Sequence, residues 1–337
     1  MQMSRLLCAT AAVALGALSS VASTGAQTAI TVGKIPSGIG LHVPSYVAMD
    51  KGFFKQEGLD ARWVQLGGRP MITAGLAGSL NFVPVPSGGA AAVLKGAKLR
   101  YVVNQSLQPL YVFIARPEIT RPEDLKGKTI GLARPGAADY DEAVIVLSRF
   151  FNMQPGRDYK VLSMPGDPER IGAVLNRSID AAMVSSPQAV RGLRGGLKVV
   201  LRTGDLMPRV GGGFWVTEEY FQGNRETVKK FIRAIARGVM YFRDNKQGSL
   251  ATIRQHLVID SDEQAGLIWE ELRHAFAAEM PKDLFRELFE SRRLDLVKSR
   301  DWPADKPLPD PEQFLARDLL ESTLREMNYV PAKAGGK

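Results

Sequence analysis

The residues best suited to bind a small molecule lie where predicted strands run into predicted helices. Ser87 and Ser186 each follow a short apolar run and precede a helical segment, and they are 99 positions apart. Helix amino termini present free N–H groups and a partial positive charge, which suits an anionic ligand. Each serine can cap its own helix and also offer a hydroxyl group to a ligand. The sequence therefore predicts a binding site built from turns at strand ends.

Two arginines and a histidine occupy similar turns. The guanidinium groups of Arg69 and Arg134 suit a carboxylate or sulfonate, although arginines in turns are more often solvated surface residues. His42 stands at the start of the first predicted helix, where a structural hydrogen bond is an equal alternative to ligand contact. Taken together, these junctions give the candidate binding set: Ser37, Gly38, His42, Gly68, Arg69, Ser87, Arg134, Gly136, Ala137, Ala138 and Ser186.

Motifs for metal binding and covalent catalysis are missing from the sequence. Its three histidines are scattered and its single cysteine stands alone, so no zinc or iron spacing is formed. It also lacks a G-x-S-x-G motif, a phosphate-loop lysine motif and a dinucleotide fingerprint. These observations favour a binding protein without a cofactor over an enzyme.

The first residues have the order of a secretory signal. Arg5 precedes an apolar run over 6–18, which gives way to small residues with cleavage sites after Ala22 or Ala26. The run is shorter than the roughly 20 apolar residues that span a bilayer. We expect residues 1–26 to be a signal peptide and the mature protein to be periplasmic, with no stable membrane insertion. Cys8 falls inside this signal, which leaves the mature chain without a thiol.

The chain is basic, with a formal net charge of +9. A basic balance can indicate a nucleic acid, an anionic membrane or an anionic ligand as the partner. The basic residues are scattered rather than gathered in one block, and an exported protein rarely meets nucleic acid. We expect a solvated basic surface, a small-molecule ligand, no nucleic-acid partner and a monomer.

Two parts of the sequence occur twice at nearly the same spacing. Thr31-Val32-Gly33 returns as Thr129-Ile130-Gly131 after 98 positions, and the segment 74–87 aligns without a gap to 173–186 after 99 positions. Two matches in one order favour an internal duplication over a chance likeness between two β-α units. Two similar lobes enclose a cleft, which is a common position for a ligand.

Alternating strand and helix patterns predict an α/β fold in which each lobe has a mostly parallel sheet flanked by helices. Ser87 is expected to cap the helix 88–95 and Asp167 to cap the next helix of the second half. After Asn224 the pattern is helical, and Asp310 with Pro311 is expected to open the final helix. The expected strands are 30–34, 61–66, 80–85, 99–104, 128–132, 160–162, 181–184 and 198–202.

Two further runs, 110–116 and 211–216, are expected to cross between the lobes. Leu110, Gly212 and Gly213 are the candidate hinge residues, and a plain β-bulge or turn at the glycines is an equal alternative. The predicted boundaries are a signal peptide at 1–26, lobe 1 at 27–112 plus 210–330, lobe 2 at 113–209, and a flexible tail at 331–337. The C-terminal helices are expected to cover the first lobe.

The segment 43–59 (VPSYVAMDKGFFKQEGL) resembles the "vA.dkGfFkkeGLdv" signature of ABC-transporter substrate-binding proteins of the sulfonate/nitrate/taurine branch, which is related to thiamine-precursor binders. The segment 123–131 (EDLKGKTIG) is similar to a second signature of that family, "dLkGKkig", and Asp180-Ala181-Ala182 before Pro187 is similar to a third. The resemblance spans roughly 30–201. Where the family usually has Asp in the first lobe, this chain has Asn81.

The resemblance implies a type II periplasmic-binding-protein fold whose lobes close on a ligand. It implies a pocket built from strand-end turns and delivery of the solute to the membrane permease of an ABC importer. We therefore expect a secreted receptor for a small anionic organic solute, such as a sulfonate or carboxylate. The alternatives are a binder of a pyrimidine thiamine precursor, a synthase-like enzyme, and a ligand-sensing accessory protein of a sensor kinase. The resemblance places in the pocket Ser37, His42, Arg69, Ser87, Arg134, Ala137 and Ser186.

Overall fold

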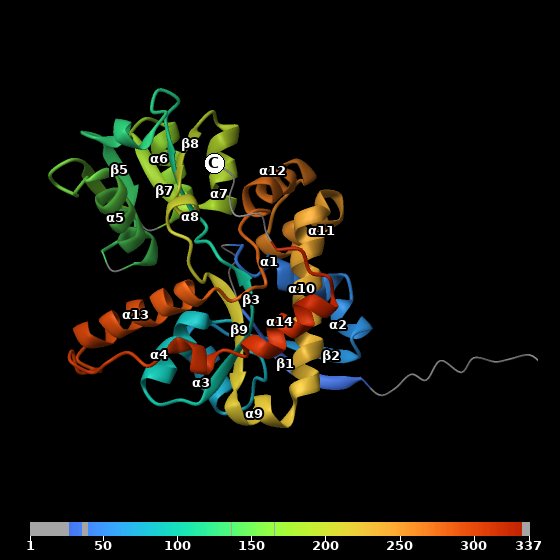
Figure 1. The fold of residues 1–337 in the computed structure, drawn as a ribbon. Helices are drawn as coiled ribbons and strands as arrows, with labels where there is room; N and C mark the ends of the chain where they lie inside the picture. The colour runs from blue at the N-terminus through green and yellow to red at the C-terminus, as the bar shows by residue number, and fades with distance from the viewer. Residues whose placement is uncertain (1–26, 36–39, 136, 165, 332–337) are drawn as a thin grey trace, which may run out of the picture.

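The computed structural model describes residues 27–35, 40–135, 137–164 and 166–331, which form two bodies (Figure 1). Lobe 2 denotes the elements from β4 (Tyr111–Ala115) to α8 (Thr203–Leu206), and lobe 1 denotes all the others. The expected signal peptide lies outside the described residues, as does the expected tail beyond residue 331.

Lobe 2 is built on a five-stranded sheet with the order β6-β5-β7-β4-β8. β5 pairs in parallel with β6 and β7, whereas β4 enters between β7 and β8 and runs antiparallel to both. The carboxyl ends of β5, β6 and β7 therefore share one edge, where a ligand of an α/β sheet usually binds. The strands are β5 (Thr129–Leu132), β6 (Lys160–Ser163), β7 (Ala181–Ser185) and β8 (Lys198–Arg202).

Lobe 1 repeats this plan with fewer paired residues. β1 pairs in parallel with β2, and β3 pairs antiparallel with β9. A parallel bridge from Val32 to Phe82 and an antiparallel bridge from Val83 to Trp215 join the two pairs, so the expected strand at 80–85 is reduced to single bridges. The resulting order, β2-β1-bridge-β9-β3, matches that of lobe 2. The strands are β1 (Thr28–Lys34), β2 (Leu59–Gln65), β3 (Leu99–Ser106) and β9 (Gly212–Thr217).

The hydrogen bonds at the start of each lobe repeat as well. The amide of Thr31 donates to Asn81 Oδ1 at 2.8 Å, and the amide of Thr129 donates to Asp180 Oδ2 at 2.7 Å. In return, the amides of Asn81 and Asp180 each donate to the threonine carbonyl at 3.0 Å. The amide side chain of Asn81 therefore makes the same hydrogen bond to the threonine as the carboxylate of Asp180 does in lobe 2. Asp180 additionally forms an ion pair with Arg116, which requires its negative charge.

The chain crosses between the lobes twice, and the strand that follows each crossing joins the sheet of the lobe that the chain has just entered. β4 follows β3 of lobe 1 but pairs in lobe 2, and β9 follows α8 of lobe 2 but pairs in lobe 1. These strands coincide with the two expected crossings. The buried apolar cores divide accordingly, with residues of 30–110 and 210–324 in one and residues of 112–197 in two smaller clusters, apart from Val190, which joins the lobe 1 core.

Helices cover both sheets and fill the C-terminal third of the chain (Figure 1). Their boundaries are α1 (Val43–Asp50), α2 (Phe53–Gln56), α3 (Gly68–Leu76), α4 (Pro86–Leu94), α5 (Ala138–Phe151), α6 (Asp167–Leu175), α7 (Ser186–Arg194), α9 (Glu218–Gly223), α10 (Arg225–Asp244), α11 (Lys246–Leu257), α12 (Asp262–Leu272), α13 (Lys282–Lys298) and α14 (Arg317–Glu326).

Three helix starts differ from those expected. α4 begins one residue before Ser87, so Ser87 lies within the first turn and Val85 is the cap residue. α6 begins at Asp167, which leaves Gly166 as its cap residue and frees the Asp167 carboxylate for other contacts. Asp310 caps only a short 3₁₀ turn at Pro311–Phe314, because Leu315 then bridges to Tyr101 at the sheet edge and the final helix starts afresh.

The C-terminal helices do more than cover lobe 1. α12 also packs against α7 of lobe 2, and Arg202 of lobe 2 forms a two-pronged ion pair with Glu271 of α12, with a shortest distance of 2.6 Å. This side of the molecule therefore joins the lobes directly, in addition to the packing of the C-terminal helices on the lobe 1 core.

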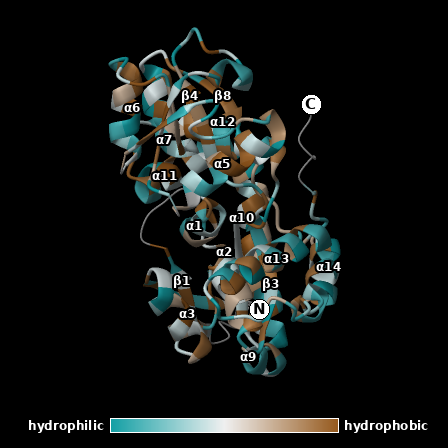
Figure 2. Ribbon diagram, turned by 90° about the vertical axis from the view of Figure 1, so that its left-hand side faces the viewer, coloured by the Kyte–Doolittle hydropathy of each residue, from teal (hydrophilic) through white to brown (hydrophobic). Residues whose placement is uncertain are grey.

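Helices at the surface have one apolar and one polar face. α14 buries Leu320 and Leu324 while Asp318 and Glu321 are exposed, and Figure 2 shows the two characters within the same ribbon. Such a stripe packs a helix onto a protein core. Among the residues that the structure describes, no helix has the length and apolar character needed to cross a membrane.

Candidate functional site

A cavity of about 380 Å³ lies between the lobes, and we refer to it as the interlobe cavity. Lobe 1 contributes Leu41 from the segment ahead of α1, the start of α4 and one face of α13, and lobe 2 contributes α5. Both crossing segments complete the wall. The lining residues are Leu41, Ser87, Pro109, Leu110, Tyr111, Ile145, Arg149, Met207, Arg209, Val210, Gly211, Glu287, Leu288, Ser291 and Arg292.

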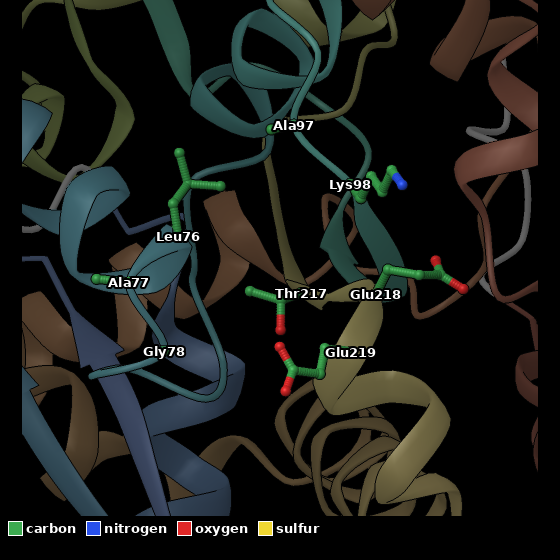
Figure 3. Close-up of a pocket in the computed structure, with 8 residues that line it drawn as sticks. All are labelled: Leu76, Ala77, Gly78, Ala97, Lys98, Thr217, Glu218 and Glu219. Atoms are coloured by element: carbon green, nitrogen blue, oxygen red, sulfur yellow. The ribbon is translucent and has the colours of Figure 1, made fainter.

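Two other pockets on the surface do not lie between the lobes. A pocket of about 540 Å³ is lined by the end of α3, the loop before β3 and the start of α9, all within lobe 1 (Figure 3). Another, of about 590 Å³, lies between the end of α4 and the segment 301–314. Neither has a wall from lobe 2, so a ligand there would not contact both lobes. The smaller interlobe cavity is therefore the better candidate site.

The structure brings two of the predicted residues to this cavity. Ser87 lines it from the first turn of α4, and Leu110 lines it from the segment before β4. Ser186 is buried at the first position of α7, where its amide donates to the carbonyl of Leu110 at 2.8 Å. The two repeated serines thus differ in role, since one lines the cavity and the other fixes the crossing segment.

His42 is held beside the crossing segments by Gln105. Gln105 Nε2 lies 2.7 Å from His42 Nδ1, and the register between β3 and β9 is irregular at this point, where Gln105 has no partner on β9. Such bulges turn a side chain away from its regular direction. Burial lowers the pKa of His42 to about 4, so the ring is neutral at physiological pH. Its Nδ1 then accepts the proton of the Gln105 amide, which leaves the ring proton on Nε2.

The lowered pKa of His42 makes stability depend on pH. Because the folded pKa of about 4 lies below the unfolded value of 6.5, the unfolded chain binds a proton first as pH falls. We expect the wild type to lose up to about 3 kcal/mol of stability between pH 6.5 and 4 relative to His42→Gln. Urea unfolding of both proteins across this range measures the difference, and parallel curves would contradict it.

The candidate hinge glycines lie inside β9 rather than in a loop. A Cβ atom on Gly212 would come within 2.9 Å of the carbonyl oxygen of Leu41, and one on Gly213 would come within 2.5 Å of Asn104 Oδ1. Neither glycine has a positive φ. The structure therefore explains the two glycines by the close approach of neighbouring atoms, which leaves no room for a Cβ atom beside the irregular register. Their role as a hinge stays a prediction.

The other candidates that the structure describes are not among the residues that line the interlobe cavity. Gly68 and Arg69 are exposed at the start of α3. Arg134 is exposed ahead of α5, its carbonyl accepts from the amide of Ala137, and Ala137 is the residue that precedes the helix. The backbone of Ala138 begins α5. Three candidates fall outside the described residues: Ser37, Gly38 and Gly136.

A buried carboxylate holds one of the lining arginines. Glu142 of α5 pairs with Arg209, which lies between α8 and β9, and the Glu142 side chain is 0% exposed whereas that of Arg209 is 41% exposed. Burial raises the pKa of Glu142, and Glu142 Oε1 has no hydrogen-bond partner among the described residues. The pair connects α5 of lobe 2 to the chain that returns to lobe 1.

A second charged group stabilises the edge of lobe 2 where α5, α6 and α7 begin. Arg170 has a buried side chain and pairs at 2.6 Å with both Asp139 and Asp167. Asp167 also accepts hydrogen bonds from the amide and hydroxyl of Ser185, at 3.0 Å and 2.6 Å. Burial, followed by the charge of Asp139, raises the pKa of the neighbouring Tyr111 to about 12, so its hydroxyl stays protonated beside the cavity.

The sequence analysis missed several residues that line or support the cavity. Arg149 and Glu142 lie within a helix that was predicted correctly, but its direction relative to the other lobe was unknown. Arg209 lies in a segment without a motif. The residues of α13 could have been proposed only from their long helical pattern, which carries no sign of which face meets the cleft.

The shared architecture and the comparison with known families agree. The family model described as "NMT1/THI5 like" matches residues 40–249, more than half of the chain. The chain belongs to the NMT1/THI5-like family. The match includes both crossing strands and ends within α11, before α12, α13 and α14 begin. A search among curated proteins gives no match.

Solved structures share the fold of this NMT1/THI5-like chain at low sequence identity. The periplasmic aliphatic sulphonate binding protein SsuA from Escherichia coli has a TM-score of 0.67 and 17% identity, covering 87% of this chain and 99% of its own. The periplasmic sulfonate-binding protein SsuA from Methylobacillus flagellatus KT gives 0.68 and 14%, covering 92% and 99%. The periplasmic nitrate-binding protein NrtA from Synechocystis PCC 6803 gives 0.61 and 11%, covering 92% of both chains. The type II periplasmic-binding-protein fold expected from the sequence is confirmed.

Proposed function

We propose that this chain is the solute-binding component of an ABC importer and that it captures a small anionic organic solute in the interlobe cavity. The observation that carries the proposal is the lining of that cavity, where Arg149, Arg209 and Arg292 stand among apolar side chains. Guanidinium groups bind carboxylates and sulfonates through paired N–H groups. The neighbours SsuA and NrtA are named for sulfonate and nitrate binding, which supports an anionic ligand.

Closure of the lobes supplies the mechanism. The cavity wall comes from lobe 1, lobe 2 and both crossing segments, so a solute in it contacts all the parts that move relative to one another. A ligand stabilises the closed form by the contacts that it gains only there. We place the hinge at Leu110, Gly212 and Gly213, and the lobe boundaries at 27–112 plus 210–330 and at 113–209. The proposed function requires only that the solute is bound and released, without a chemical reaction.

We further propose that the protein acts in the periplasm as a monomer and delivers its solute to a membrane permease. The apolar run at 6–18 with the small residues after it supports export. The structural neighbours are periplasmic proteins by name, which agrees with this location.

Thermal unfolding of residues 27–337 in the presence of sulfonates, carboxylates and pyrimidines tests the proposal. A bound anion at 100 times its Kd should stabilise the protein by about 2.7 kcal/mol. Arg149→Gln should weaken that anion at least about tenfold, or about 1.4 kcal/mol, while Arg121→Gln, an exposed arginine of lobe 2, should leave binding unchanged. Stabilisation by pyrimidines alone, or equal affinity in the Arg149 variant, would overturn the anionic ligand.

A further inference from the structure

The carboxylate of Glu142 is buried beside the interlobe cavity, and one of its two oxygens is unpaired. The Glu142 side chain is 0% exposed, Oε2 accepts from Arg209, and Oε1 has no hydrogen-bond partner among the described residues. Glu142 stands three positions before Ile145 on α5, and both Ile145 and Arg209 line the cavity. A buried charge is unfavourable unless it is fully paired, so the charge state of Glu142 depends on what else Arg209 contacts.

Arg209 is positioned to contact Glu142 and a ligand at the same time. Among the described residues its guanidinium group contacts Glu142 through Nη2 alone, and the Arg209 side chain is 41% exposed where it lines the cavity. A guanidinium group has five N–H donors, so several of them remain for an anionic group in the cavity. An anion bound there becomes a second negative partner of the same cation.

The buried charges closest to this pair do not compensate for a second anion. Asp139 lies one turn before Glu142 on α5, and together with Asp167 it shares the guanidinium group of Arg170, at 2.6 Å from each. With Glu142 and Arg209 included, three carboxylates face two guanidinium groups. An added anion therefore increases an existing excess of negative charge.

The other elements around Glu142 contribute no buried cation. Burial, followed by the charge of Asp139, raises the pKa of Tyr111 on β4 to about 12, so its hydroxyl stays neutral. The strands β5 and β7, which also pack against α5, have no titratable side chain. The remaining titratable groups of α5, of α8 and of the facing cavity wall are not buried: Tyr140, Asp141 and Arg149 on α5, Asp205 on α8, and Glu287 and Arg292 on α13.

We propose that capture of the anionic solute is coupled to the uptake of one proton from solvent by Glu142, so that the site binds its ligand more tightly in acid. The ligand replaces Glu142 as the anionic partner of Arg209, and the protonated carboxyl group needs no counter-charge. The number of negative charges around Arg209 is then the same before and after binding. This inference rests on the proposed function, because it describes how pH regulates the same site.

The charges around Glu142 fix the direction of the pH dependence. Burial raises the pKa of Glu142 in the ligand-free protein, while the charge of Arg209 and the hydroxyl of Thr203 act in the opposite direction. A ligand anion on Arg209 weakens that opposition and raises the pKa of Glu142 further. By linkage, protonation of Glu142 raises the ligand affinity by the same factor. The affinity therefore increases as pH falls from the ligand-bound pKa to the ligand-free pKa, and is constant below it.

Calorimetry in paired buffers measures the proton directly. Pentanesulfonate and benzenesulfonate are the probes, because a sulfonate stays ionised at every pH used and cannot itself supply the pH dependence. For residues 27–337 at about pH 7, we expect a binding enthalpy that changes with the ionisation enthalpy of the buffer, as proton uptake requires. The affinity should rise at least about fivefold from about pH 8 to about pH 5.5.

The variant Glu142→Gln isolates the contribution of this carboxylate. Because an amide resembles the protonated carboxyl group, the variant should take up no proton and bind the sulfonates equally at both pH values. At about pH 8 it should bind them at least about fivefold more tightly than the wild type. The control Asp141→Asn changes the exposed neighbour on α5 and should keep the uptake. His42→Gln should keep it as well, because a pKa of about 4 leaves His42 neutral at these pH values.

The outcomes distinguish the proton coupling from the function on which it rests. Binding to the wild type without proton uptake overturns the coupling and leaves the proposed function standing, and this result requires no variant. The same holds for uptake that persists in Glu142→Gln or is lost in His42→Gln. Weaker binding by Glu142→Gln at both pH values also overturns the coupling, because Glu142 would then only position Arg209. If neither these sulfonates nor carboxylates of equal length bind at any pH, the proposed function is overturned together with the coupling.

Discussion

Replacing Arg170 with methionine is expected to lower the free energy of unfolding by about 3–5 kcal/mol, the usual cost of breaking a buried ion pair from one side. The Arg170 side chain is 4% exposed and neutralises Asp139 and Asp167 together. Methionine fills much of the same volume but leaves two nearly buried carboxylates 31 and 3 positions away in the chain without their common cation. Urea unfolding monitored by circular dichroism gives the change directly.

Arg121→Met is the matched control for this measurement. Arg121 also pairs with an aspartate, Asp124, three positions along, but its side chain is 72% exposed. Exposed pairs of this kind contribute about 0–1 kcal/mol. Similar losses in the two variants would show that burial of the Arg170 cluster carries no energetic weight.

Removal of Arg209 should lower the free energy of unfolding, because the buried carboxylate of Glu142 then has no counter-charge. We expect Arg209→Ala to lose about 3 kcal/mol at neutral pH, at the low end for a broken buried pair because Arg209 itself is 41% exposed. Glu142→Gln should lose less than about 1.5 kcal/mol, since a neutral amide needs no counter-charge and Arg209 can remain solvated. Urea unfolding tests whether Arg209→Ala loses more stability than Glu142→Gln, and the reverse order would contradict this account.

The pH dependence of the Arg209 variant provides an independent check. The pKa of Glu142 is raised in the folded protein by burial, so its carboxyl holds a proton more tightly when folded than when unfolded. Its ionisation therefore costs stability as pH rises above the unfolded pKa, and the cost disappears on acidification. The deficit of Arg209→Ala relative to wild type should shrink toward pH 4, and a deficit independent of pH would contradict the role given to Glu142.

Local patterns were sufficient to predict most elements of the fold. The strands at 198–202 and the helix at 138–151 have the expected limits, because each is set by residues adjacent in sequence. The repeats around Thr31 and Thr129 predicted two similar lobes, and the hydrogen bonds to Asn81 and Asp180 give the physical basis of that likeness. Two helix starts were displaced toward the amino terminus, since Pro86 and Ser87 belong to α4 and Asp167 belongs to α6 instead of preceding it.

The cavity was harder to predict because it depends on contacts between distant segments. Glu142 and Arg209 are 67 positions apart, and nothing near either residue shows that they meet. Glu287 lies on a helix whose charged residues look like those of any solvated face. Ser87 and Leu110 were found because a strand-end turn and a crossing can be recognised locally, whereas the partners facing them belong to other layers of the fold.

Because β9 completes the lobe 1 sheet only after the chain has passed through lobe 2, the two lobes become complete at different times during synthesis. All five strands of the lobe 2 sheet lie within 111–202, so that sheet is complete once this stretch has left the ribosome or the export channel. The lobe 1 sheet begins first, at Thr28, but waits for Gly212–Thr217 and for the helices that follow. Domains usually fold from the amino terminus onward. In this protein the half that is translated first is finished last, and until then its earliest strands must be kept from pairing with the wrong neighbours.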